Sequence, residues 1–244
     1  MREILCFGDS NTYGLIPGTK ERYKENIRWT GILQQKLKEQ DCRIVEEGLC
    51  GRTTVFEDEL RKNRKGSDLL PVLLESHAPI DQVVLMLGTN DCKSYYHASA
   101  EVIGLGVEKL IGQIRQAGEH IKILLVSPIL LGEKVWEPEY DPEFDEQSVE
   151  TSRQLKTVYS RIAKKHGMLQ NQAAGTESIW TRKAIADLQK QSMKDLQDKE
   201  MRRSRYRERT DSFLRNNKRK STKTILTKEN KLCTIYLLKK LHTI

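Results

Sequence analysis

The sequence predicts an α/β domain built on a mostly parallel sheet, confined to about residues 1–169 of the 244. Short apolar runs typical of buried strands alternate with longer segments whose apolar residues recur at helical spacing, and this alternation is characteristic of a parallel sheet. All six prolines and fourteen of the fifteen glycines also precede residue 170. The turns of a folded domain are therefore concentrated in the first part of the chain.

Four strands are expected, because each of four short runs is rich in aliphatic and β-branched residues. They are residues 3–7, 43–47, 82–87 and 121–127. Between and after them, apolar residues at helical spacing predict helices at 29–38, 102–116 and 148–165. A further helix should begin just after the first strand, where Gly-Asp-Ser provides turn and capping residues.

The remainder of the chain has a different composition. Residues 170–244 hold 19 Lys and Arg against 8 Asp and Glu, whereas residues 1–169 carry a net charge of −3. We therefore expect two parts, a folded domain at 1–168 and a basic, charge-rich tail at 169–244 that is helical or disordered. Two tail segments, 202–209 with its Tyr206 and 216–223, have the chemistry to bind phosphates and a base. Charge runs are more often solvated faces, so a nucleic-acid partner is not expected.

Cysteine spacing and hydropathy indicate a cytoplasmic protein. The five cysteines are widely spaced and include no Cys-x-x-Cys pair, so neither a disulfide framework nor a zinc site is indicated. The apolar run that follows Met1 is too short for the core of a signal peptide. No run approaches the roughly 18–20 apolar residues of a membrane span, and no membrane partner is expected.

Small or polar residues follow three of the predicted strands at the point where each strand ends. Ser10 follows the first strand, Gly51 the second and Asn90 the third. Taken singly, Asp9 or Ser10 could cap a helix, Gly51 could be a turn glycine, and Asn90 with Asp91 could form another cap. Parallel strands end at one edge of a sheet, where open α/β folds bind ligands. Together, these residues could supply a nucleophile and two donors to an oxyanion.

The stretches GDSNTYG, EEGLCGRTT and MLGTND resemble the first three sequence blocks of the SGNH hydrolases, also called the GDSL esterase/lipase family, and in particular its bacterial arylesterase and acyltransferase branch. The resemblance implies a three-layer α/β/α domain with a flavodoxin-like parallel sheet. It implies Ser10 as the nucleophile, with the backbone N–H groups of Ser10 and Gly51 and the side chain of Asn90 as the oxyanion hole. Asp9 would support the nucleophile loop. The substrate would be a small acyl ester, a homo-oligomer is compatible with the family, and neither a metal nor an organic cofactor is required.

The family's last block, Asp-x-x-His after a fifth strand, is absent from this sequence. His242 is preceded at the required position by Lys239, and no Asp-x-x-His occurs anywhere. We therefore expect a sheet without its last strand and helix, and no general base or Asp partner is identified; His97 is the least implausible substitute. We hypothesise that the reading frame slipped near Met168, which would leave an impaired serine ester hydrolase. The alternatives are an inactive domain that retains ligand binding, or nucleic-acid binding through the tail.

Substrate preference is only weakly encoded. Residues 130–146 form a long acidic and aromatic segment in which Trp136, Tyr140 and Phe144 either line an acyl pocket or pack a surface loop. Cys50 and Cys92 flank the candidate site residues and are interpreted as small packing groups.

Overall fold

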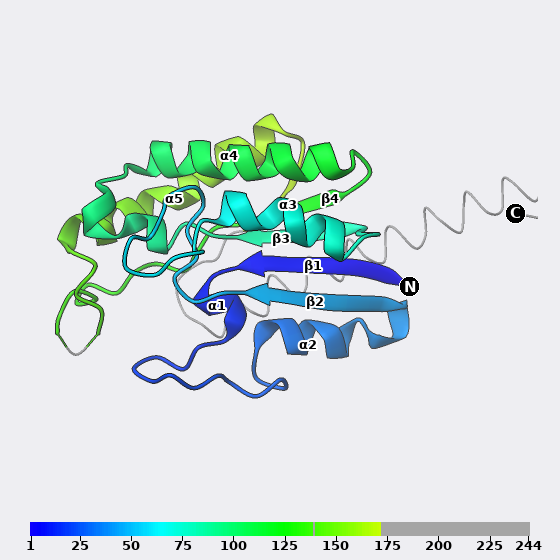
Figure 1. Ribbon diagram of the computed structural model, residues 1–244, viewed down its shortest axis with the longest axis horizontal. Helices are drawn as coiled ribbons and strands as arrows, with labels where there is room; N and C mark the ends of the chain where they lie inside the picture. Colours follow the sequence, from blue (N-terminus) through cyan, green and yellow to red (C-terminus); the bar gives the residue numbers. More distant parts are fainter. Residues whose placement is uncertain (139, 172–244) are drawn as a thin grey trace, which may run out of the picture. The chain divides into compact units, whose positions relative to one another are not determined.

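The structure, a computed structural model, describes residues 1–138 and 140–171. Its sheet contains five parallel strands in the order β2-β1-β3-β4-β5. The first four of these strands are labelled in Figure 1. The strands are β1 Arg2–Gly8, β2 Cys42–Gly48, β3 Gln82–Met86, β4 Lys122–Val126 and β5 Leu169–Asn171. All four predicted strands are confirmed, and no strand end is shifted by more than one residue.

Helices cover both faces of the sheet, which confirms the three-layer α/β/α arrangement. They are α1 Ser10–Tyr13, α2 Trp29–Lys36, α3 Gly66–Ser76, α4 Ala100–Ala117 and α5 Glu146–Lys165, with short 3-10 turns η1 Lys38–Gln40, η2 Asn90–Cys92 and η3 Ser94–Tyr96. Helices α3, α4 and α5 lie on one face and α2 on the other (Figure 1). Strand side chains alternate accordingly: Leu5 and Phe7 belong to the core under α3–α5, whereas Ile4 and Cys6 belong to the core under α2.

Helix α3 was not among the predicted helices, and its sequence contains Pro71 in the middle of a short apolar run. Proline has no N–H and so cannot bond to the carbonyl four residues earlier, that of Ser67. The side-chain amide of Gln113, on α4, donates to this carbonyl at 2.7 Å. A tertiary hydrogen bond therefore replaces the one that Pro71 removes, and the helix continues.

The expectation that the last strand is missing is wrong. Strand β5 pairs in parallel with β4, from Leu169 beside Leu124 to Asn171 beside Val126. This pairing uses main-chain groups, so it does not depend on particular side chains. The first three residues of the expected tail thus belong to the sheet. The expected place of the closing helix, the two basic segments and nearly all of the sequence after the hypothesised frame slip lie outside the described residues.

Within residues 1–138 and 140–171, the structure contains no helix long and apolar enough to cross a membrane.

Candidate active site

The candidate site residues gather at the carboxyl edge of the sheet. Helix α1 and the segments that follow β2 and β3 lie at the ends to which the strand arrows point (Figure 1). The pairing register sets Gly8 at the end of β1 beside Gly48 of β2 and Met86 of β3. Ser10, Gly51 and Asn90 follow these three positions within a few residues, so neighbouring strands bring them to one edge.

Asp9 caps the short helix that begins at Ser10. Its Oδ1 accepts hydrogen bonds from the Asn11 backbone N–H at 2.9 Å and from the Asn11 side chain at 3.0 Å. Complete burial raises the pKa of Asp9, and hydrogen bonds from Asn11 and Thr89 and the charge of Arg52 oppose the rise. The capping interpretation of Asp9 is confirmed, and Ser10 is left half-buried at the start of α1.

Asn90 and Asp91 connect two loops rather than cap a helix. The Asn90 side chain is buried and donates to the Arg52 carbonyl at 3.0 Å. Asp91 is fully buried and accepts from the Thr54 backbone N–H at 2.9 Å and from the Thr54 hydroxyl. No side chain caps η2, so the capping alternative for this pair is wrong. Burial raises the pKa of Asp91 to about 6, against the hydrogen bonds from Thr54.

Arg52 joins the ends of the first two strands, a role that the sequence reasoning did not assign. Its guanidinium donates to the Gly8 carbonyl at 3.0 Å and to the Glu47 carbonyl, and it lies 4.2 Å from the centre of the Phe7 ring. Burial lowers the pKa of Arg52 to about 10, although the charges of Glu47 and Asp9 favour its protonated form. The only local signal was its place in the Gly-Arg-Thr-Thr stretch beside Gly51.

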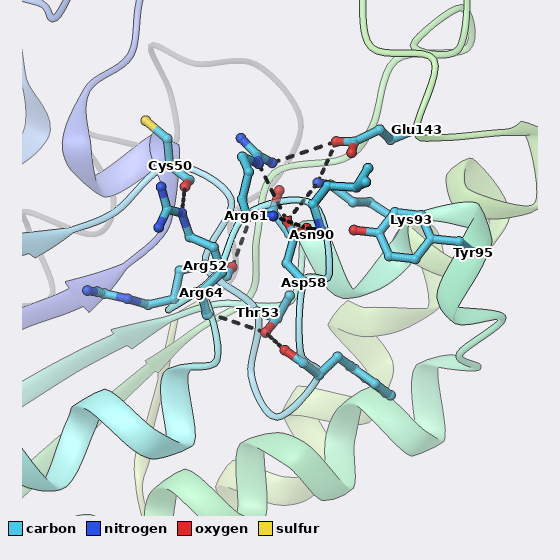
Figure 2. Close-up of polar contacts among 12 residues, drawn as sticks. Cys50, Arg52, Thr53, Asp58, Arg61, Arg64, Asn90, Lys93, Tyr95 and Glu143 are labelled. Atoms are coloured by element: carbon cyan, nitrogen blue, oxygen red, sulfur yellow. Dashed lines mark hydrogen bonds and ion pairs between the residues drawn. The ribbon is translucent and has the colours of Figure 1, made fainter.

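A set of charged residues, here called the ionic cluster, borders the turn at Gly51. It comprises Asp58, Arg61, Lys93 and Glu143, which Figure 2 shows linked by dashed contacts. Asp58 and Lys93 are almost completely buried. The sequence reasoning missed this cluster, because its members come from three separate loops.

The aromatic residues of the 130–146 segment divide between packing and a cavity. Phe144 is part of the hydrophobic core, and Tyr140 is 68% exposed. Trp136 lines a cavity of about 810 Å³ together with Glu133, Asp145 and Arg153. Phe144 therefore has the packing role, and Trp136 alone of the three lines this cavity. Cys92 is buried and Cys50 is partly exposed.

A profile of the GDSL-like lipase/acylhydrolase family matches residues 6–180. The chain belongs to this family. Solved structures of esterases resemble it at 28–34% identity. The aryl esterase of M. smegmatis is 31% identical with a TM-score of 0.71, covering 80% of this chain and 99% of its own. Est24, a carbohydrate acetylesterase from Sinorhizobium meliloti, is 34% identical with a TM-score of 0.66, covering 72% and 87%.

A putative arylesterase from Agrobacterium tumefaciens str. C58 is also similar, at 28% identity and a TM-score of 0.65, and the match covers 80% of this chain and 99% of that one. No curated protein sequence matches the chain significantly. By family resemblance the GDSL-type chain is a carboxylic ester hydrolase. The match to the family profile ends at residue 180, twelve residues beyond the predicted end of the domain at 168.

A general base for this GDSL-type hydrolase is not found among the described histidines. His77 pairs with Glu47 at 2.9 Å and His166 with Glu108 at 3.1 Å. His97 is exposed and lines a cavity of about 300 Å³ between the η2–η3 region and the start of α5. In the part of the chain that the structure describes, none of these side chains hydrogen-bonds to Ser10, and the role of His97 stays a prediction.

Proposed function

We propose that the chain is a serine ester hydrolase for small acyl esters, with Ser10 as the nucleophile. The backbone N–H groups of Ser10 and Gly51 and the side-chain amide of Asn90 would stabilise the oxyanion. The observation that carries this proposal is the bond from Asn90 to the Arg52 carbonyl at 3.0 Å. This bond holds the loop after β3 against Arg52, the residue that follows Gly51. It lies at the same edge of the sheet as Ser10, which follows β1.

The reaction would proceed by acyl transfer through Ser10. Its Oγ would form a bond to the ester carbonyl carbon while its proton passes to a base, and the carbonyl oxygen would take the negative charge. The ester C–O bond would then break, and the leaving alcohol would take the proton. Water would release the acyl group by the same steps in reverse order, which regenerates Ser10. The similarity of the chain to an aryl esterase and to a carbohydrate acetylesterase supports short acyl groups on aryl or carbohydrate alcohols.

The proton acceptor is the part that this sequence lacks. Because no Asp-x-x-His occurs in the 244 residues, we infer that proton removal from Ser10 is impaired. Loss of the base alone costs on the order of 10⁶ in the chemical step of a serine protease, while the oxyanion hole and substrate binding still contribute. Very slow turnover by the chain as it stands is therefore the expected behaviour.

The test is hydrolysis of p-nitrophenyl acetate by the full chain, by Ser10→Ala, and by a version whose frame after codon 168 is restored to encode Asp-x-x-His. An exposed serine at the end of α3 supplies the matched control, Ser76→Ala. Turnover that appears in the restored chain and disappears in its Ser10→Ala variant supports the proposal. Equal turnover with and without Ser10 would refute it, and the inactive-domain and tail-binding alternatives would then be tested by acetate and RNA binding.

A further inference from the structure

The Arg61 guanidinium occupies the space where any other residue at position 51 would place its Cβ. Gly51 has φ +82°, and a Cβ added to it would lie 2.7 Å from Arg61 Nη2 and 2.8 Å from Arg61 Cζ. These distances are shorter than van der Waals contact, so the guanidinium already rests on the Cα of Gly51. Glycine is favoured here by its backbone conformation, and its missing Cβ lets the guanidinium approach the turn this closely.

Arg61 is held in this position by two carboxylates. Its Nε lies 3.4 Å from Asp58 and its Nη2 lies 3.6 Å from Glu143. Asp58 is itself fixed, because it accepts the Leu60 and Arg61 backbone N–H groups at 3.0 and 2.9 Å. Arg61 therefore pairs with carboxylates from two separate segments of the chain.

The ionic cluster extends from Gly51 to the loop that carries Asn90. The Lys93 ammonium, three residues after Asn90, lies 2.5 Å from Glu143 and 3.8 Å from Asp58. The backbone N–H of Ser94 donates to the Glu143 carbonyl at 2.9 Å. One set of contacts therefore connects the Gly51 turn, the Asn90 loop and the 130–146 segment (Figure 2).

A role in stability alone is a weak explanation for this cluster. Burying Lys93 and Asp58 has a desolvation cost that their mutual attraction repays only in part, and apolar residues in such places are often at least as stable. Arg61 is the most exposed member, at 41%, and exposed ion pairs contribute little to stability. Its contact with Gly51 is better explained by an effect on that turn.

We propose that Arg61 is a positioning residue of the oxyanion hole, which holds the Gly51 turn and brings a positive charge beside its peptide N–H. The inference rests on the proposed function, because it assigns Gly51 as an oxyanion donor. A cation fixed before the reaction stabilises the negative charge that develops on the carbonyl oxygen, without reorganisation at that moment. Asp58 and Glu143 supply the anchoring, and Arg61 acts through Gly51 without itself bonding to the oxyanion.

Cys50 provides a reporter of this charge that does not depend on catalysis. It precedes Gly51, it is partly exposed, and its carbonyl accepts from Arg64 Nε at 2.8 Å. Burial and the negative charge of Asp9 raise the pKa of the Cys50 thiol, while the charges of Arg61 and Arg64 lower it. The pH at which this thiol becomes reactive therefore measures the positive potential at the turn.

The experiment measures the rate of iodoacetamide reaction with the full chain against pH, in a Cys233→Ser background. The other described cysteines, Cys6, Cys42 and Cys92, are buried. We expect Arg61→Gln to move the midpoint upward and to slow alkylation at pH 7.5 by about 3- to 10-fold. Arg61→Lys should retain a midpoint near that of the parent chain. The matched control is Arg43→Gln, which removes an exposed arginine paired with Glu3 on the strands and should change nothing.

Two results of the thiol assay would overturn the proposal. An unchanged midpoint in Arg61→Gln would show that the charge does not reach the turn, and equal shifts in the Gln and Lys variants would assign the effect to packing. In the chain with its Asp-x-x-His restored, Arg61→Gln should lower kcat more than it raises KM, with partial rescue by Lys. A shifted thiol midpoint without any Ser10-dependent turnover would instead refute the proposed function while leaving the charge at the turn established.

Discussion

Replacing Asp91 by asparagine should stabilise the protein at neutral and alkaline pH, although it removes a charged partner of Thr54. Asp91 is fully buried, accepts the Thr54 backbone N–H with both oxygens at 2.9 and 3.1 Å, and has its pKa raised by burial to about 6. In the unfolded chain the same carboxyl has a pKa of about 3.9. The folded state therefore binds this proton more tightly than the unfolded state does.

The sign and size of the effect follow from this difference. Because the folded pKa of Asp91 is the higher one, its contribution to stability is complete below about pH 4 and is lost as the pH rises through about 6. A difference of about two pKa units corresponds to about 3 kcal/mol over the whole range, of which about 2 kcal/mol falls between pH 4.5 and 8. Asparagine mimics the protonated carboxyl: its oxygen can accept from the Thr54 N–H, and its NH₂ can donate to the Thr54 hydroxyl.

Urea unfolding followed by circular dichroism at pH 4.5 and pH 8 measures this difference. The free energy of unfolding of Asp91→Asn, relative to the parent chain, should increase by about 2 kcal/mol from the lower to the higher pH. Asp68→Asn is the control, since Asp68 is exposed and pairs with Lys65 at the surface. A relative stability that stays constant across this range would show that Asp91 is already ionised at pH 4.5, and the reasoning would be refuted.

Two further substitutions test the surroundings of the site. Gly51→Ala should destabilise the fold by about 1–3 kcal/mol and lower turnover of the restored chain by about 100-fold. Gly18→Ala is the control, because Gly18 has a similar φ of +73° and a Cβ added there would meet no atom within 4 Å. Comparing the urea midpoints of the two variants therefore distinguishes backbone strain from the clash with Arg61. Glu46→Gln should cost about 1.5–3 kcal/mol, because Glu46 pairs at 2.8 Å with the largely buried Arg28. Trypsin should also cleave the loop after α1 faster in Glu46→Gln. Unchanged cleavage would contradict a stabilising role for the Glu46–Arg28 pair.

Much of the fold could be predicted from the sequence because the strands are short apolar runs and helices α4 and α5 have a clear apolar face. Helix α3 could not be predicted, since Pro71 removes a hydrogen bond that only Gln113 of another helix replaces. Strand β5 was missed for a related reason. Its pairing with β4 uses backbone groups, and the three residues 169–171 contain no side-chain pattern that predicts a strand.

Part of the candidate site could likewise be predicted from local sequence, whereas the rest depends on tertiary contacts. Ser10, Gly51 and Asn90 could be grouped because each follows a strand, and parallel strands end at one edge. The ionic cluster could not, because Asp58 and Lys93 lie in different loops and meet only after the chain has folded. Their charges look, in the sequence, like those of any solvated surface loop.

The proposed site separates substrate positioning from proton transfer along the chain. The contacts that fix the nucleophile and the proposed oxyanion donors all lie before Asn171: the Asp9 cap, the Asn90–Arg52 bond and the Asp91–Thr54 bonds. The family's general base follows the fifth strand, and this sequence has no Asp-x-x-His there. Loss of the general base from the sequence after β5 would thus abolish turnover but leave the proposed oxyanion donors and the acyl-binding residues in place. An impaired esterase and a ligand-binding domain are then the same molecule observed in two assays, and restoring the base should recover turnover without altering the affinity for the acyl group.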